Sequence, residues 1–383
     1  MASLQPVPML DLKRQYQPIQ AELHEALGQV LETRQFILGS PAAAFEQEAA
    51  RQLGVAHAIG CSSGTDALWL MMAAAKIGPG DAVVTTPFSF FASVSAILRA
   101  GATARLADID PATFLLSVPA VEQLLDGPQG KGVKAVLPVH LYGQATAGFG
   151  HLGTTRGLLV LEDAAQAWGA EAGSVKAGGL GQAAAFSFYP TKNLSAAGDA
   201  GMVTTQSDEL AERARMLRQH GMRRRYYHDE VGWNTRLDGF QAAILSVKLN
   251  YIDGWNQSRR TVAERYHALF RATGLAEAGP YPTHGVVLPH ELPGTRHVWH
   301  QYVIRTARRD QLRAFLTERK IGSEIYYPVP LHRQEALGSL GYKAGDFPEA
   351  ERAAAEVLAL PIFPELREDE QQTVVAAIAE FLS

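Results

Sequence analysis

The sequence has a single cysteine, Cys61, among 383 residues, and its 35 basic side chains nearly balance 39 acidic ones. One cysteine cannot form an internal disulfide, and it excludes any zinc or iron–sulfur site built from several cysteines. Because no excess positive charge is present, we expect no nucleic-acid partner. No apolar run is long enough to span a membrane, and the first twenty residues lack the apolar core of a signal peptide. These absences favour a cytoplasmic globular protein without a membrane partner.

The hydrophobic content of 47% is sufficient for a sizeable core, and the length suits one large domain and one smaller domain. Short, continuously apolar runs alternate with helical stretches, which is typical of strands buried on both faces of a mainly parallel sheet. The predicted strands are residues 56–61, 82–87, 103–109, 133–142, 158–161, 183–189 and 202–205, and the predicted helices are 12–33, 65–76, 89–100 and 209–220. Residues 143–157 predict a loop or weak helix. Longer helices follow, so we predict an α/β fold with domains at 1–252 and 253–383.

Two motifs at strand ends carry groups that suit a phosphate and a ring nitrogen. Residues 63–66, Ser-Gly-Thr-Asp, lie where a strand turns into a helix, and the free N–H groups of a helix N-terminus bind phosphate. Taken alone, this motif is more commonly an ordinary helix cap. Asp163 follows the strand at 158–161, at the sheet edge where α/β proteins bind ligands. Its carboxylate could pair with a cationic ring nitrogen or cap the next helix.

A third motif places Lys192 just beyond the strand at 183–189, in a segment of small residues. A lysine in such a partly buried position suits an amine nucleophile, although a surface lysine is the commoner explanation. Taken together, a phosphate-binding turn, an aspartate and a lysine are the groups that hold pyridoxal 5'-phosphate by its phosphate, ring nitrogen and aldehyde.

Several longer segments resemble the DegT/DnrJ/EryC1/StrS family of sugar aminotransferases. The resemblance covers nearly the whole chain, and its most specific segments are Ser-Phe-Tyr-Pro-Thr-Lys at 187–192 and Asn-Thr-Arg-Leu-Asp at 234–238. Further matching segments lie at residues 10–13, 36–39, 63–68, 78–81, 162–166 and 327–332. The resemblance implies the fold of aspartate aminotransferase, fold type I of pyridoxal phosphate enzymes, with a smaller C-terminal α+β domain.

The resemblance also implies a role for individual residues in catalysis. Lys192 matches the lysine that bonds to the cofactor and then moves the proton. Asp163 matches the aspartate that binds the pyridine nitrogen, and Gln166 lies near the phenolic oxygen. Pyridoxamine 5'-phosphate would be the intermediate form of the cofactor.

Other matches concern the phosphate and the cofactor ring. Gly64 and Thr65 match the phosphate-binding turn, assisted by Ser187. Asn234 matches an asparagine that reaches the phosphate in the neighbouring subunit, which implies a homodimer with shared active sites. Phe90 falls where the family stacks an aromatic ring on the cofactor.

The implied reaction moves an amino group from L-glutamate to a keto-sugar linked to a nucleoside diphosphate, for amino-sugar biosynthesis in polysaccharides, lipopolysaccharides or antibiotics. The pattern of residues 220–238 favours a UDP- or dTDP-linked 3-keto sugar, with a 4-keto sugar as the alternative. The substrate diphosphate needs positive or donor groups, since a planar guanidinium suits phosphate oxygens. The candidates, each of which could equally serve a surface or structural role, are Arg223, Arg224, Arg225, Arg236 and His332.

Two other classes of protein compete with this interpretation. Residues 60–64, Gly-Cys-Ser-Ser-Gly, match the nucleophile motif of serine hydrolases, with Ser62 as the nucleophile. A regulator or scaffold could also keep the fold without catalysis, although Lys192 and Asp163 speak against it. His297 and His300 lack a third ligand at suitable spacing, so we expect no metal site. Trp168 stands where many relatives have histidine and could change the packing near the cofactor.

Overall fold

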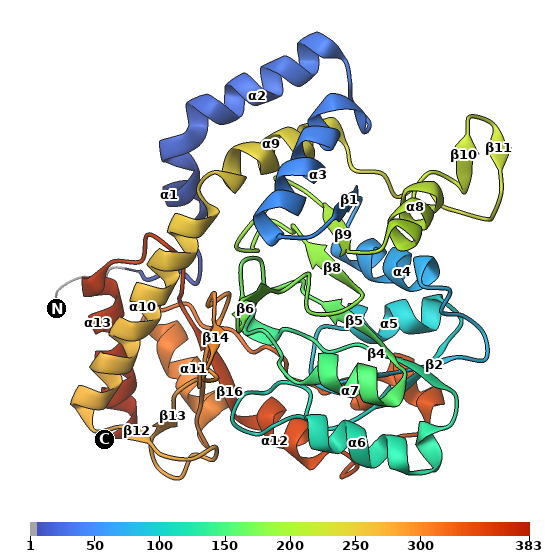
Figure 1. Cartoon of the computed structure of the whole chain (residues 1–383). Coiled ribbons are helices and arrows are strands. Elements are labelled where there is room, and N and C mark those ends of the chain that lie inside the picture. The colour runs from blue at the N-terminus through green and yellow to red at the C-terminus, as the bar shows by residue number, and fades with distance from the viewer. Residues whose placement is uncertain (1–5) are drawn as a thin grey trace.

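The computed structural model describes residues 6–383 and is built around a seven-stranded sheet (Figure 1). The strands lie in the order β1-β9-β8-β5-β4-β2-β3, and only β9 runs antiparallel to its neighbours. Their bounds are His57–Cys61 (β1), Ala82–Thr85 (β2), Thr103–Leu106 (β3), Val133–Val136 (β4), Leu159–Asp163 (β5), Ala183–Ser187 (β8) and Gly201–Thr205 (β9). The predicted strand at 133–142 is therefore too long, because β4 stops at Val136.

Helices cover both faces of this sheet, which explains why its strands are apolar throughout. On β2, Val83 packs into one cluster with α4 (Gly64–Ala74), α5 (Ala92–Arg99) and α8 (Asp208–Leu217). The next residue, Val84, packs on the opposite face. That face is covered by α3 (Gly39–Leu53), α6 (Val118–Asp126), α7 (Phe149–Arg156) and α9 (Gly239–Leu249). Successive residues of a strand point to opposite faces, so both must be apolar.

A second sheet forms from the C-terminal part of the chain, beyond the long helix α10 (Ile252–Thr273). Its strands are β12 (Ala276–Glu277), β13 (Val286–Val287), β15 (Tyr302–Arg305) and β16 (Val357–Leu360). Helices α11 (Arg309–Glu318), α12 (Pro348–Glu356) and α13 (Glu368–Leu382) accompany this sheet (Figure 1). The division at 252/253 stays a prediction.

A small sheet crosses that predicted division. A three-stranded sheet pairs β14 (Thr295–Arg296) with β6 (Glu171–Ala172), which in turn pairs with β7 (Val175–Lys176). The N-terminal helices α1 (Leu12–Tyr16) and α2 (Gln20–Thr33) lie outside the large sheet, and α2 packs on α9. A short hairpin of β10 (Met222–Arg224) and β11 (Tyr227–His228) projects from the body near α8 (Figure 1). Among residues 6–383, no helix is long and apolar enough to span a membrane.

Candidate active site

The three predicted motifs meet at one edge of the large sheet. Asp163 is the last residue of β5 and Ser187 the last of β8, and these parallel strands are neighbours with Asp163 opposite Ala185. Gly64 begins α4 directly after β1 and approaches the end of β8. Carboxyl ends of parallel strands form the ligand-binding edge of α/β sheets. The fold thus brings together residues that are more than one hundred positions apart in the sequence.

The carboxylate of Asp163 is buried and held by two donors. The Ser93 hydroxyl donates to Oδ2 at 2.7 Å, and the Ala165 backbone N–H donates to Oδ1 at 3.2 Å. Burial raises the pKa of Asp163, whereas these hydrogen bonds and the positive charge of Lys192 lower it in part. A buried carboxylate is stabilised most by a nearby cation, which a protonated ring nitrogen would provide.

Lys192 lies beyond β8 in a turn closed by its backbone N–H, which donates to the Tyr189 carbonyl at 2.8 Å. Burial lowers the pKa of its amine to about 8, although the negative charge of Asp163 acts in the opposite direction. A lysine amine is nucleophilic only when it is neutral, so this lowered pKa increases its reactivity near physiological pH. Lys192 thus has the environment of a reactive amine.

The predicted phosphate-binding cradle consists of Gly64, Thr65 and Ser187, and Gly64 lies against Ser187 at the start of α4. The Ser63 hydroxyl caps α4 by accepting from the Asp66 backbone N–H at 3.0 Å. A Cβ atom on residue 64 would lie 2.4 Å from Ser187 Cβ and 2.8 Å from Ser187 Oγ. Only glycine therefore allows the Ser187 hydroxyl to lie against the first turn of α4. Backbone N–H groups and a hydroxyl are donors that suit a phosphate monoester.

Gln166 has an amide orientation fixed by two tyrosines. Its Oε1 accepts from the Tyr142 backbone N–H at 2.6 Å, and its Nε2 donates to the Tyr327 hydroxyl at 3.3 Å. Phe90 is 58% exposed, and its ring centroid lies 6.2 Å from that of Tyr327. Sequence reasoning missed Tyr327 as a site residue, although it begins the Tyr-Pro-Val-Pro segment. Ser93 was missed as well, because a serine within a helix carries no signal in one sequence.

The three consecutive arginines of the hairpin do not join Lys192 in this chain. Arg223 forms ion pairs with Glu212 and Asp229, and Arg224 and Arg225 each lie over a tyrosine ring of the same hairpin. All three are exposed, and the hairpin points away from the large sheet (Figure 1). If these arginines bind substrate as predicted, they must do so at the active site of a second molecule of this protein.

The remaining candidates differ in their surroundings. Asn234 is exposed, its Oδ1 accepts from Arg236 Nε at 3.0 Å, and the Arg236 backbone pairs with Cys61 beside the start of the cradle. The His332 side chain is fully buried, and its Nε2 lies 2.8 Å from Glu351 Oε1. This burial favours a structural role for His332 over the predicted contact with substrate, since the imidazole presents no surface.

Ser62 lacks the partner that a hydrolase nucleophile requires. Its hydroxyl donates to Asp66 Oδ2 at 2.6 Å and shares a hydrogen bond with the Thr235 hydroxyl at 2.6 Å. Within residues 6–383, no histidine hydrogen-bonds to Ser62, whereas the activated serine of a hydrolase is bonded to a general base. The geometry explains Ser62 as part of the cap of α4.

Trp168 packs among apolar side chains. Its ring centroid lies 5.1 Å from that of Phe186 and 5.6 Å from that of Phe188, and the side chain is buried in the cluster that contains α3 and α9. The departure from histidine at this position is therefore accommodated as apolar packing.

Comparison with known proteins decides the family. A model of the DegT/DnrJ/EryC1/StrS aminotransferase family matches residues 17–379. The chain belongs to this family. It has the fold of its solved members, and it is an aminotransferase. The resemblance seen in the motifs is thus confirmed over almost the whole sequence.

Three relatives match nearly end to end. One from Geobacillus stearothermophilus, named "Pleiotropic regulatory protein", is 48% identical over 98% of this chain and 98% of its own. A UDP-N-acetyl-3-dehydro-alpha-D-glucosamine 3-aminotransferase from Acidithiobacillus ferrooxidans is 39% identical, with the same coverage of both chains. A dTDP-3-amino-3,4,6-trideoxy-alpha-D-glucose transaminase from Streptomyces venezuelae is 39% identical over 98% of this chain and 96% of its own.

Solved structures agree with the fold. S. venezuelae DesV, in complex with a ketimine intermediate, superposes with a TM-score of 0.93 at 39% identity and covers 99% of both chains. NtdA from Bacillus subtilis, with bound cofactor PMP, superposes with a TM-score of 0.86 at 27% identity. That match covers 98% of this chain and 85% of NtdA.

Proposed function

We propose that this chain is a pyridoxal phosphate-dependent enzyme that transfers the amino group of L-glutamate to C3 of a keto-sugar carried by UDP or dTDP. The observation that carries the proposal is the meeting of Lys192, Asp163 and the cradle at one sheet edge. The names of two relatives, one acting on a UDP-linked and one on a dTDP-linked 3-amino sugar, support the substrate class.

Each residue of the site has a defined task in this proposal. When bound, pyridoxal phosphate supplies the electron sink for a carbanion at the α-carbon of the donor. Lys192 would bond to the cofactor and, once released as a neutral amine, accept the α-proton and return a proton later. Asp163 would keep the ring nitrogen protonated. Gln166 would donate a hydrogen bond to the phenolic oxygen.

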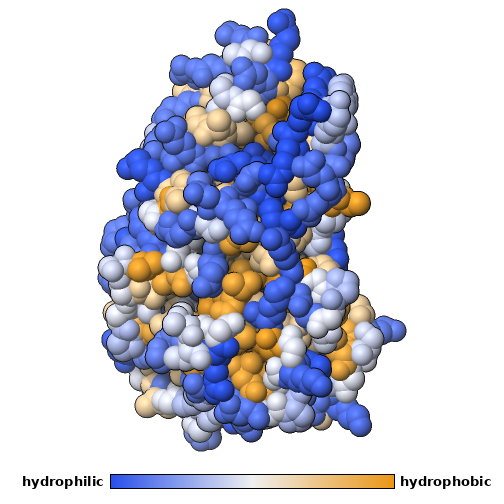
Figure 2. Space-filling view, turned by 45° about the vertical axis from the view of Figure 1, so that its right-hand side comes forward, coloured by the Kyte–Doolittle hydropathy of each residue, from blue (hydrophilic) through white to orange (hydrophobic). Residues whose placement is uncertain are grey.

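The proposal includes a homodimer in which neighbouring molecules complete each site. Large hydrophobic side chains are exposed at Phe36, Ile37 and Val231, and Figure 2 shows a hydrophobic area in the middle of one face. Exposed apolar surface of this kind marks protein–protein contacts. In such a dimer, Asn234 would reach the partner's cofactor phosphate, and the hairpin arginines would meet the diphosphate of its substrate.

A regulatory role is the second candidate, because a relative that is 48% identical is named as a regulatory protein. A scaffold needs no nucleophilic lysine beside a buried aspartate, so Lys192 and Asp163 favour catalysis. A single assay of amino-donor conversion distinguishes the two roles. A regulator without activity would convert no amino donor to its keto acid.

The experiment that tests the proposed substrate compares four acceptors with L-glutamate as donor. UDP-linked and dTDP-linked sugars would each be supplied as 3-keto and 4-keto forms, and the amino-sugar product would be quantified by mass spectrometry. We expect the 3-keto forms to be aminated at least about tenfold faster, a difference of about 1.4 kcal/mol in activation free energy. Preference for a 4-keto sugar would overturn the choice of C3, and turnover of neither would overturn the substrate class.

A further inference from the structure

The segment that follows Lys192 has no helix or strand to fix its path. Residues 193–200 lie between β8 and β9 and form only isolated backbone hydrogen bonds, such as Ala196 N–H to the Phe188 carbonyl at 2.8 Å. Two buried side chains next to Lys192 anchor it instead. The first is Asn193, whose Nδ2 donates to Asn256 Oδ1 at 2.8 Å and to the Val298 carbonyl at 2.9 Å.

The second anchor is Ser195, which is bound by the buried amine of Lys248 on α9. Lys248 Nζ donates to the Ser195 carbonyl at 2.8 Å, lies 2.6 Å from Ser195 Oγ, and lies 3.0 Å from the Tyr16 hydroxyl. The Lys248 and Ser195 side chains are fully buried, and no carboxylate of residues 6–383 pairs with the amine. Burial lowers the pKa of Lys248 to about 7. A buried lysine is costly, so its three oxygen partners indicate a specific task.

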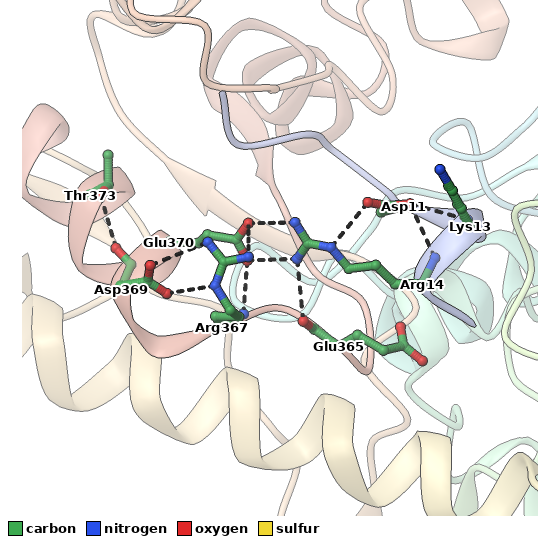
Figure 3. Close-up of polar contacts among 8 residues, drawn as sticks. All are labelled: Asp11, Lys13, Arg14, Glu365, Arg367, Asp369, Glu370 and Thr373. Atoms are coloured by element: carbon green, nitrogen blue, oxygen red, sulfur yellow. Dashed lines mark hydrogen bonds and ion pairs between the residues drawn. The ribbon is translucent and has the colours of Figure 1, made fainter. Parts of the chain in front are cut away.

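Helix α1 connects this amine to α13. Tyr16 ends α1, and two residues earlier Arg14 binds both carboxylate oxygens of Glu370 on α13, at 2.8 and 2.7 Å. Figure 3 shows the Arg14 guanidinium between Glu370 and Asp11, whose side chain caps α1. Arg14 thus ties α1 to Glu370, and Tyr16 at the end of the same helix contacts Lys248, which binds the segment that follows the reactive lysine.

We propose that Lys248 is a positioning residue: by holding Ser195 against α9 and α1, it sets the position of the Lys192 amine over the cofactor. The inference rests on the proposed function. Lys248 does not touch the reacting atoms, and it acts three residues away through the backbone of the anchored segment. Reactive groups depend on such support, because displacements near 1 Å can reduce a rate by about 100-fold.

The test compares three full-length variants with a matched control. Lys248→Met removes all donors but keeps an unbranched apolar side chain, Tyr16→Phe removes one acceptor, and Ser195→Ala removes the hydroxyl acceptor. Lys13→Met, on the exposed side of α1, is the control for a lysine-to-methionine change. Each protein is loaded with pyridoxal phosphate. The measurements are the pH titration of the bound cofactor's visible absorption, the fraction fixed covalently by borohydride, the steady-state constants and the melting temperature.

We expect Lys248→Met to shift the midpoint of the absorption titration by about half a pH unit or more. Its kcat should fall about 10- to 100-fold while KM for glutamate changes less than about threefold. Tyr16→Phe and Ser195→Ala should shift the midpoint in the same direction by less, and Lys13→Met should match wild type.

A lowered melting temperature with an unchanged titration midpoint and kcat in the folded variants would overturn the inference and leave Lys248 a purely structural residue. If Lys248→Met does not fold, the same criterion applies to Tyr16→Phe and Ser195→Ala. The proposed function fails separately, if wild-type protein takes up no pyridoxal phosphate that borohydride can fix.

Discussion

Replacing Gly64 with alanine tests the predicted phosphate-binding cradle at the point where the first turn of α4 lies against the end of β8. The new Cβ would lie 2.4 Å from Ser187 Cβ and 3.0 Å from Ser187 Cα, which is backbone. Normal carbon–carbon contacts are about 3.5–4.0 Å, so α4 and β8 must separate at the edge where the phosphate would bind. Overpacking of this kind costs about 1–3 kcal/mol of stability.

The same displacement should weaken cofactor binding. Moving the first turn of α4 removes one or two charge-assisted hydrogen bonds, each contributing about 1.5–3 kcal/mol. We therefore expect the Kd for pyridoxal phosphate to rise about 10- to 150-fold for the loss of one such bond. The assay is a fluorescence titration of cofactor-free protein, with the melting temperature recorded in parallel.

Two further variants make the result interpretable. Gly254 lies exposed in α10 with no atom near its position for a Cβ, so Gly254→Ala should leave binding unchanged and stabilise the helix by about 1 kcal/mol. Adding Ser187→Gly to Gly64→Ala removes the nearest contacts and should recover part of the lost melting temperature. A Kd for Gly64→Ala within twofold of wild type would refute the assignment of the cradle.

Three other predictions follow from the site. The rate at which cofactor-free protein captures pyridoxal phosphate, measured by stopped-flow absorbance, should rise with pH through about 8, where the Lys192 amine becomes neutral. A rise that continued beyond pH 10 would show that the pKa of Lys192 is not lowered. Asp163→Asn should lower the rate of the glutamate half-reaction about 100-fold, because an amide cannot balance a protonated ring nitrogen; single-turnover kinetics showing a loss below threefold would contradict its role. Mixing Lys192→Ala with Asn234→Ala chains should create dimers with one intact site, and activity no higher than that of either variant alone would exclude shared sites.

The large sheet could be predicted because strands that are buried on both faces are continuously apolar in the sequence. Residues 82–87 and 183–189 gave strands close to their true positions, and the edge at which Asp163 and Lys192 meet follows from parallel pairing. The strand at 133–142 was overextended, since regular pairing of β4 ends at Val136. Beyond it Val139 forms only an isolated bridge with Asp163, and the chain reaches Tyr142 in a left-handed conformation. Local apolarity continues through this segment, so one sequence does not mark where its pairing ends.

Features that depend on contacts between distant parts of the chain could not be predicted from the sequence. Some strands of the second sheet, such as Val286–Val287, are only two residues long, and their pairing depends on tertiary packing. Burial of His332 under Glu351 and projection of the hairpin are likewise consequences of the assembled fold. The roles of Lys248 and Ser93 have no local motif, because their partners lie 53 and 70 residues away.

The most direct test of the central claim is the absorption spectrum of the purified full-length protein loaded with pyridoxal phosphate, recorded before and after addition of L-glutamate. Our account predicts a visible band that disappears as a near-ultraviolet band grows, with 2-oxoglutarate released in proportion to the sites, and neither change in Lys192→Ala. A protein that stays colourless after incubation with pyridoxal phosphate would contradict the assignment of Lys192 and Asp163.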